Sequence, residues 1–269
     1  MTYSPSRLQT ARGFLFVPGD RPDRFAKAAA SGADAVIVDL EDAVAASDKD
    51  RARAHAADWF AAGGSAVLRV NPPGTTWFGA DLEVAARHGV PVMVPKSEDP
   101  AVLTDTARLT GGACPLIPLV ETAAGIEGAT AVCAAPGVIR VAFGNADYSA
   151  QLGVAHDDQL ALAYARSRLV SASAAAGLCP PVDGVTTSVR DLDALTADVT
   201  HARRLGFSGK LCIHPAQVDG VQTGFAPSED ELRWARSVLA AGESVTVIDG
   251  QMIDKPVLDR ARRVLAAEG

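Results

Sequence analysis

The sequence is poor in aromatic side chains, in cysteine and in long apolar runs, and each scarcity excludes a class of protein. Phe, Trp and Tyr make up 5% of the 269 residues, which suits close packing of helices on strands better than a β-sandwich. The four cysteines form no C-x-x-C pair, so we expect reduced, mostly buried thiols in a cytoplasmic protein; they are Cys114, Cys133, Cys179 and Cys212. Apolar stretches such as Leu116–Val120 fall far short of the ~20 residues that span a bilayer, and the polar segment Met1–Arg12 does not resemble a signal peptide.

Positive charge and several catalytic signatures are also in short supply. The 25 Lys and Arg against 32 Asp and Glu leave a formal charge of −7, which argues against nucleic acid or an anionic membrane as a partner. The chain has no G-x-x-x-x-G-K-[ST], G-x-S-x-G or H-E-x-x-H, the signatures of P-loop NTPases, α/β-hydrolases and zincins. An anionic substrate would therefore need local positive charge or a metal ion to hold it.

What the sequence does contain is a series of short apolar, β-branched runs, each followed by a helix-length amphipathic or Ala-rich segment. Nearly continuous apolar runs are typical of strands in a sheet that is covered on both faces. Eight strand–helix alternations predict a (β/α)8 TIM barrel, for which ~250 residues is typical, with a doubly wound open sheet as the alternative. The expected strands are Phe14–Val17, Ala35–Leu40, Ala66–Val70, Pro91–Val94, Leu116–Val120, Val138–Phe143, Pro181–Val185 and Lys210–Ile213.

The composition changes after Phe225. Ser228 and Glu231 have the spacing of a capping box that opens a helix, and a last helix is expected to begin at Pro256. We therefore expect a barrel domain over residues 1–225 and a C-terminal helical lid or oligomerisation arm over 226–269, rather than a second domain.

Polar and charged residues follow the expected strands, and the C-terminal ends of the strands carry the active site in such a barrel. Glu121 and Asp147 follow neighbouring strands, with no His or Cys beside them. Two carboxylates with few other protein ligands suit Mg²⁺, or alternatively Mn²⁺, because these ions keep water or substrate oxygens in their remaining positions. The alternative is structural, with Glu121 capping a helix and Asp147 pairing with an arginine.

A second acidic group, Asp39, Glu41 and Asp42, follows the second strand. These carboxylates could be further ligands, could bond waters around the ion, or could form an acidic helix N-terminus favoured by the helix dipole. Arg69 ends the third strand and could bind a carboxylate or a developing enolate oxygen. It could also pair with Glu41 or Asp42, or do both. We count Arg69, Glu41 and Asp42 among the candidate catalytic residues.

Two further polar residues leave alternatives open. Lys96 follows the fourth strand, and a lysine there could form a Schiff base with a carbonyl substrate instead of belonging to a metal site. His214 precedes a proline after the eighth strand, a context that favours a role in positioning the backbone over a role as a base.

The motifs around these residues resemble the citrate lyase β-subunit-like group of the HpcH/HpaI aldolase superfamily, which includes malyl- and citramalyl-coenzyme A lyases. The matching segments occur in order over nearly the whole chain, and together they are far more specific than any one of them. One departure is Asn145, where many relatives carry a small or acidic residue. The segments are F-V-P-G-D-R-P (Phe16–Pro22), D-L-E-D-A-V (Asp39–Val44), L-R-V-N (Leu68–Asn71), V-P-K (Val94–Lys96), L-V-E-T (Leu119–Thr122), F-G-N-A-D (Phe143–Asp147), C-I-H-P-A-Q (Cys212–Gln217) and G-Q-M-I-D (Gly250–Asp254).

The resemblance implies a homotrimer or hexamer of barrels, with Mg²⁺ held by Glu121 and Asp147 and with Arg69 against the substrate. It also implies that Asp254 is an acid/base carboxylate that a neighbouring subunit's tail lays over the active site. By itself, Asp254 would be expected only to cap the helix at Pro256. The implied contacts to substrate, thioester and coenzyme A are Phe16, Arg21, Lys27, Ala146, Ile213 and His214.

We therefore expect a Mg²⁺-dependent carbon–carbon lyase. It would cleave a malyl-, citramalyl- or related 3-hydroxyacyl-coenzyme A into an acyl-coenzyme A and a 2-oxo acid, or condense the two. If water captures the thioester, the same site becomes a thioesterase. The sequence is also compatible with a catalytically silent partner subunit and with a metal-dependent 2-oxo acid aldolase that does not use coenzyme A. Arg21 and Lys27 argue against the aldolase, because they suggest an anion-binding channel.

Overall fold

The computed structural model describes residues 3–240, 246–248 and 251–268. The chain divides into two compact units, Met1–Gly224 and Phe225–Gly269. Each unit is built around apolar residues of its own.

The first unit is a closed barrel of parallel strands that follow one another in chain order, β1 pairing with β8 to complete the circle. All eight expected strands are present, so the predicted (β/α)8 barrel is confirmed and the open sheet was the wrong alternative. The strands are β1 Gly13–Pro18, β2 Ala35–Asp39, β3 Val67–Arg69, β4 Val92–Val94, β5 Leu116–Val120, β6 Ala142–Phe143, β7 Val182–Asp183 and β8 Gly209–Cys212.

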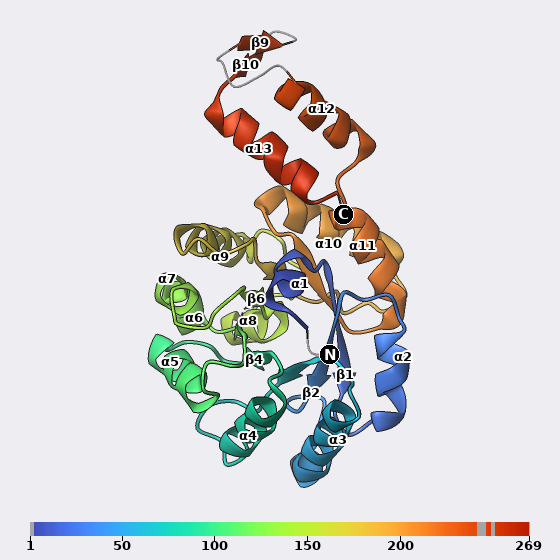
Figure 1. Cartoon of the computed structure of the whole chain (residues 1–269), viewed down its shortest axis with the longest axis vertical. Helices are drawn as coiled ribbons and strands as arrows, with labels where there is room; N and C mark the ends of the chain where they lie inside the picture. The colour runs from blue at the N-terminus through green and yellow to red at the C-terminus, as the bar shows by residue number, and fades with distance from the viewer. Residues whose placement is uncertain (1–2, 241–245, 249–250, 269) are drawn as a thin grey trace. The chain divides into compact units, whose positions relative to one another are not determined.

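Helices connect the strands and form a ring outside them (Figure 1). Several end as the sequence predicts, because Gly89 and Gly206 take the left-handed conformation at the C-caps of their helices. The helices of this unit are α1 Pro5–Thr10, α2 Phe25–Ala29, α3 Lys49–Ala61, α4 Phe78–His88, α5 Pro100–Leu109, α6 Ala123–Glu127, α7 Ala129–Cys133, α8 Asn145–Leu152, α9 Ala163–Ala175, α10 Leu192–Leu205 and α11 Val218–Phe225.

The interior of the barrel is closed at the N-terminal ends of the strands. Leu8 of α1 packs with inward-facing strand residues such as Phe14 and Leu211. The side chain of Arg140 is fully buried there, and its Nη1 donates hydrogen bonds to the carbonyl oxygens of Leu8 and Ala11 at 2.9 and 2.6 Å. Because the residues that the structure describes fill this end, the C-terminal ends of the strands are where a ligand can enter.

Strands β6 and β7 are shorter than the sequence predicts. Within the apolar runs Val138–Phe143 and Pro181–Val185 the strands hold two residues each, joined by the single pair Ala142 and Val182. Val138 adds one isolated bridge to Leu116 of β5. Side chains replace the missing ladder at both ends. Arg140 Nε donates to the Pro180 carbonyl at 2.8 Å, and Asn145 bonds the main chain of Val185. The backbone groups remain satisfied without regular strand geometry.

The second unit, Phe225–Gly269, pairs helix α12, Glu229–Ala240, with helix α13, Lys255–Ala266. The predicted capping box is present: Glu231 N–H donates to Ser228 Oγ, and Ser228 N–H donates to Glu231 Oε2. A two-stranded antiparallel sheet, β9 Thr246–Ile248 and β10 Gln251–Ile253, lies between the helices in the chain. Gly250 of the G-Q-M-I-D motif lies outside the described residues. The core of the unit contains Ala235, Val238, Ile253, Leu258 and Ala261.

The four cysteines are free thiols, three of them buried and Cys179 partly exposed, as the sequence predicts. In the described part of the chain, no helix combines the length and the apolar character needed to cross a bilayer.

Candidate active site

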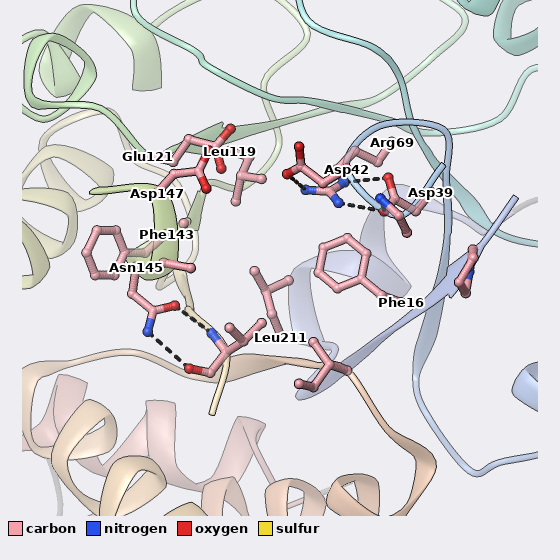
Figure 2. Close-up of a pocket in the computed structure, with 16 residues that line it drawn as sticks. Phe16, Asp39, Asp42, Arg69, Leu119, Glu121, Phe143, Asn145, Asp147 and Leu211 are labelled. Carbon is pink, nitrogen blue, oxygen red and sulfur yellow. Dashed lines mark hydrogen bonds and ion pairs between the residues drawn. The ribbon is translucent and has the colours of Figure 1, made fainter. Parts of the chain in front are cut away.

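A cavity of about 390 Å³ opens at the C-terminal ends of the strands. Figure 2 shows Glu121 and Asp147 on one side of it and Arg69 with Asp39 and Asp42 on the other. Apolar side chains such as Phe16 and Leu119 line the cavity between these two charged groups. The cavity is lined by Phe16, Pro18, Asp39, Asp42, Ala43, Arg69, Leu119, Glu121, Phe143, Gly144, Asn145, Ala146, Asp147, Val185, Leu211 and Ile213.

Glu121 and Asp147 come from neighbouring strand ends and meet at one cation, the ammonium of Lys96. Glu121 follows β5 and is 3% exposed, whereas Asp147 lies in the first turn of α8. Lys96 Nζ lies 3.3 Å from Glu121 Oε1 and forms an ion pair with Asp147 Oδ2. Burial raises the pKa of Glu121 above its ordinary value, and the neighbouring Lys96 works against this rise. The pair is therefore a site built to hold positive charge.

This pair fits a hard divalent ion. Gly144 leaves room beside Glu121, because a Cβ at that position would lie 2.5 Å from Glu121 Oε2. Among the described residues, no three His, Cys, Asp or Glu side chains converge closely enough to hold a metal ion by themselves. Two oxygen donors with open positions suit Mg²⁺, which keeps several waters or substrate oxygens, and do not suit zinc.

Arg69 is held by the acidic loop that follows β2. Its Nε and Nη2 donate to the two carboxylate oxygens of Asp39 at 2.7 and 2.6 Å, and its guanidinium lies 4.7 Å from the centroid of the Phe16 ring. Nη1 lies 3.0 Å from Glu41 Oε2 and 3.6 Å from Asp42 Oδ2. Burial opposes the charge of Arg69, but Asp39 outweighs it and raises the pKa above its ordinary value. Arg69 is thus a fixed cation with N–H groups still free to meet a ligand.

Glu41 is a buried carboxyl group beside this cation. Only 4% of the residue is exposed, and its Oε2 accepts no hydrogen bond from any residue that the structure describes. Burial raises the pKa of Glu41 to about 8; Arg69 opposes this rise, and the charges of Glu121 and Asp42 add to it. A carboxyl group that titrates near neutral pH can give or take a proton under working conditions.

Lys49 holds the main chain of the acidic loop through hydrogen bonds, a role that the sequence did not predict. Its buried ammonium donates to the carbonyl oxygens of Leu40 and Glu41, both at 2.7 Å. Burial lowers the pKa of Lys49, with Asp39 and Glu41 acting in the opposite direction. The lysine lies in the first turn of α3, where its spacing from the acidic motif carries no recognisable signal.

Asn145 ties the α8 side of the site to the loop after β7. Its Oδ1 accepts from Val185 N–H at 2.8 Å, and its Nδ2 donates to the Val185 carbonyl at 3.0 Å (Figure 2). Gly184 makes room for this, since a Cβ there would lie 2.1 Å from Asn145 Oδ1. The sequence marked Asn145 as a departure from its relatives, but nothing in the sequence connected it with Gly184 or Val185.

The structure brings most of the predicted site residues together. Phe16, Asp42, Arg69, Glu121, Ala146, Asp147 and Ile213 line the cavity, and Glu41 lies beside Arg69. Arg21, Lys27 and His214 are exposed and do not line it. His214 caps the short 3₁₀ helix Pro215–Gln217, with Nδ1 accepting from Ala216 N–H at 3.1 Å. Asp254, in the second unit, accepts a 3.3 Å hydrogen bond from Val257 N–H at the start of α13, the cap that its position before Pro256 predicts.

Comparison with known proteins places this arrangement in a family. The HpcH/HpaI aldolase/citrate lyase family matches residues 12–215. The chain belongs to this family. It is 38% identical over 267 residues to a citrate lyase subunit beta-like protein of Mycobacterium tuberculosis, covering 96% of this chain and 95% of that protein. It is 34% identical over 270 residues to a (3S)-malyl-CoA thioesterase of Cereibacter sphaeroides, covering 95% and 93%.

A solved structure in this family is similar over almost the whole chain. It is the crystal structure of CitE from Mycobacterium tuberculosis in complex with magnesium, acetoacetate and coenzyme A. The two share 36% sequence identity and a TM-score of 0.84, with 97% of this chain and 99% of that chain covered.

Proposed function

We propose that this HpcH/HpaI family member is a Mg²⁺-dependent lyase acting on small 3-hydroxyacyl-coenzyme A thioesters of the malyl or citramalyl type. The hydroxyl group loses its proton and becomes the carbonyl of a 2-oxo acid. The electron pair of the adjacent carbon–carbon bond passes to the thioester, which leaves as an enolate. Protonation of the enolate carbon completes the acyl-coenzyme A. The reverse sequence is a condensation.

The observation that carries this proposal is the division of charge across one cavity. A carboxylate pair suited to a divalent ion and a buried arginine line opposite sides of one cavity, whose volume is about 390 Å³. A retro-Claisen cleavage needs this arrangement, because a cation must stabilise each of the two oxygens whose charge changes. The similar CitE structure holds magnesium, an oxo acid and coenzyme A together.

We assign Glu121 and Asp147 to the metal and Arg69 to the enolate. When bound, the divalent ion would act as a Lewis acid toward the oxygens of the substrate's acid half. Arg69 cannot turn away from the cavity, because Asp39 holds Nε and Nη2 of its guanidinium. Its remaining donors are pre-oriented for an oxygen that gains negative charge, so little reorganisation is needed during the reaction.

Two carboxyl groups are candidates for proton transfer. Glu41, with its pKa raised to about 8 by burial, can hold or release a proton at neutral pH. Asp254 is our candidate for protonating the enolate carbon from the C-terminal unit of a neighbouring subunit. Its present hydrogen bond to Val257 N–H is 3.3 Å long, so little is lost when the carboxyl group turns toward a substrate. In this proposal residues 226–269 serve as a lid, and the active enzyme is a homotrimer or hexamer.

Coenzyme A is assigned to the rim of the cavity. Phe16, Ala146 and Ile213 offer apolar surface for the acyl thioester, and 40% of Ile213 is exposed. Arg21 and Lys27 are exposed cations on the segment after β1, suited to phosphate groups that remain in solvent. His214 lies next to Ile213 at the same strand end.

A second candidate function is hydrolysis of the thioester, because a thioesterase of malyl-CoA is 34% identical to this chain over nearly its full length. Malyl- and citramalyl-coenzyme A, each incubated with protein and Mg²⁺, separate the two. A lyase releases a 2-oxo acid and leaves the coenzyme A thiol acylated. A thioesterase releases free thiol and no 2-oxo acid. Turnover of none of these thioesters would contradict both functions.

A further inference from the structure

Lys96 has an unusual backbone conformation for the position it occupies. Among the described residues it is the one non-glycine residue with a positive φ, at 50°. An L-residue in the left-handed region is sterically disfavoured, and such strain persists where the surrounding structure imposes it. Here the surroundings are the two carboxylates that we assign to the metal.

Both ends of Lys96 are directed at these carboxylates. Its main-chain N–H donates to Glu121 Oε1 at 2.9 Å, and its Nζ lies 3.3 Å from the same oxygen. The ammonium also forms the ion pair with Asp147 Oδ2, so it lies between the two acidic groups. The left-handed turn after β4 is what brings the main-chain donor and the side-chain cation to one place.

The ammonium balances a charge that would otherwise be costly. Glu121 is almost fully buried, and two neighbouring carboxylates in such a place repel one another unless a cation lies with them. An ammonium and a divalent ion cannot use the same oxygens at once. We propose that Lys96 is the built-in counter-cation of the metal-free site, and that a divalent ion binds by displacing it. This rests on the proposed function only for the assignment of Glu121 and Asp147 as ligands.

A second cavity beside Lys96 can receive the displaced ammonium. This cavity, of about 240 Å³, is lined by Lys96 itself and in part by Glu98 and Asp99. The Lys96 side chain is 32% exposed, so its stem can turn between the two cavities without repacking the core. Lys96 therefore exchanges one acidic neighbourhood for another when the ion enters.

Displacement lowers the apparent affinity for the ion by the fraction of protein in which the site is open. Removing the ammonium should therefore tighten binding. For Lys96→Gln we expect Mn²⁺, titrated into chelator-treated protein and followed by electron paramagnetic resonance, to bind about tenfold more tightly. Arg108→Gln is the matched control, because it removes an exposed positive charge elsewhere on the barrel. Lys96→Met removes the charge without introducing an amide, so it should also bind Mn²⁺ more tightly than wild type if the effect comes from the lost ammonium.

Thermal stability separates displacement from a long-range effect of charge. If Lys96 occupies the site, Lys96→Gln should melt at a lower temperature than wild type in chelator, and the gap should close in saturating Mg²⁺. Tighter Mn²⁺ binding without this loss in chelator would overturn the proposal, as would unchanged or weaker binding. Glu121→Gln tests the metal assignment separately. If that variant binds Mn²⁺ like wild type, the proposed function fails at its metal site as well, whereas an effect in Glu121→Gln but none in Lys96→Gln rejects only the role of Lys96.

Discussion

Replacing Glu41 by glutamine should change how the stability of the metal-free protein depends on pH. The folded-state pKa of Glu41 is about 8, raised from an ordinary value of 4.5 mainly by burial. The folded protein therefore holds a proton that the unfolded chain releases. The stabilisation from this proton is fully present below about pH 4.5 and is lost as the pH rises through about 8. Glutamine cannot ionise, so Glu41→Gln lacks this loss.

The magnitude follows from the number of protons and the pH interval. One proton per molecule corresponds to about 1.4 kcal/mol per pH unit. Between about pH 5.5 and 7.5, where the folded protein keeps most of the proton and the unfolded chain has lost it, wild type should lose about 2 kcal/mol relative to Glu41→Gln. Other titrating groups cancel in this difference, because both proteins contain them.

Urea unfolding of both proteins in chelator, at the two pH values, measures the effect directly. Glu83→Gln, an exposed glutamate on α4, is the control and should show no difference in slope. A free energy difference between wild type and Glu41→Gln that is the same at both pH values would refute the reasoning. It would mean that Glu41 is already ionised in the folded protein.

Three further predictions concern the site residues. Arg69→Lys keeps the charge but loses the planar fork that Asp39 holds, so steady-state assays should show kcat lower by about 10²-fold; a change confined to KM would mean that Arg69 only binds substrate. Asn145→Ala leaves the main-chain groups of Val185 unpaired, so urea unfolding should show a loss of about 2 kcal/mol, and Mn²⁺ binding should weaken because α8 carries Asp147. Asp254→Asn should abolish turnover but leave Mn²⁺ binding intact, and its co-expression with Glu121→Gln should restore part of the activity; co-assembled oligomers that stay inactive would place the tail over its own barrel or reduce Asp254 to a helix cap.

The barrel could be predicted from the sequence because its strands are buried on both faces. Leu116–Val120, for example, has no solvent-facing side, so this strand is an unbroken apolar run that is visible without any knowledge of its neighbours. The lengths of β6 and β7 could not be predicted in the same way. Their ladder is replaced by the side chains of Arg140 and Asn145, and such contacts depend on which segments the fold brings together.

In the candidate site, too, the positions at strand ends could be predicted from the sequence, whereas the contacts between side chains could not. Glu121, Arg69 and Asp42 lie at or just after the C-terminal ends of their strands. The rule that strand ends meet at one rim predicts that they share a cavity, as they do. The partners that hold them could not be found this way. One alternative from the sequence was that Arg69 pairs with Glu41 or Asp42, and its Nη1 does lie near both. Its shortest hydrogen bonds go to Asp39, which is in register with Arg69 on the neighbouring strand. Lys96 was a candidate for a Schiff base, and its position after β4 gave no sign that its side chain would pair with two carboxylates.

The most direct test of the proposed chemistry is the release of 2-oxo acid from malyl-coenzyme A by protein first stripped of metal and then given Mg²⁺. Chelation should lower the rate by about 10³-fold or more, since a Lewis acid supplies several kcal/mol of stabilisation. Mg²⁺ should restore cleavage to wild type and to Glu83→Gln, but not to Glu121→Gln. Cleavage that survives chelation, together with a borohydride-trapped adduct on Lys96, would contradict the account and assign the carbon–carbon bond to Schiff-base chemistry.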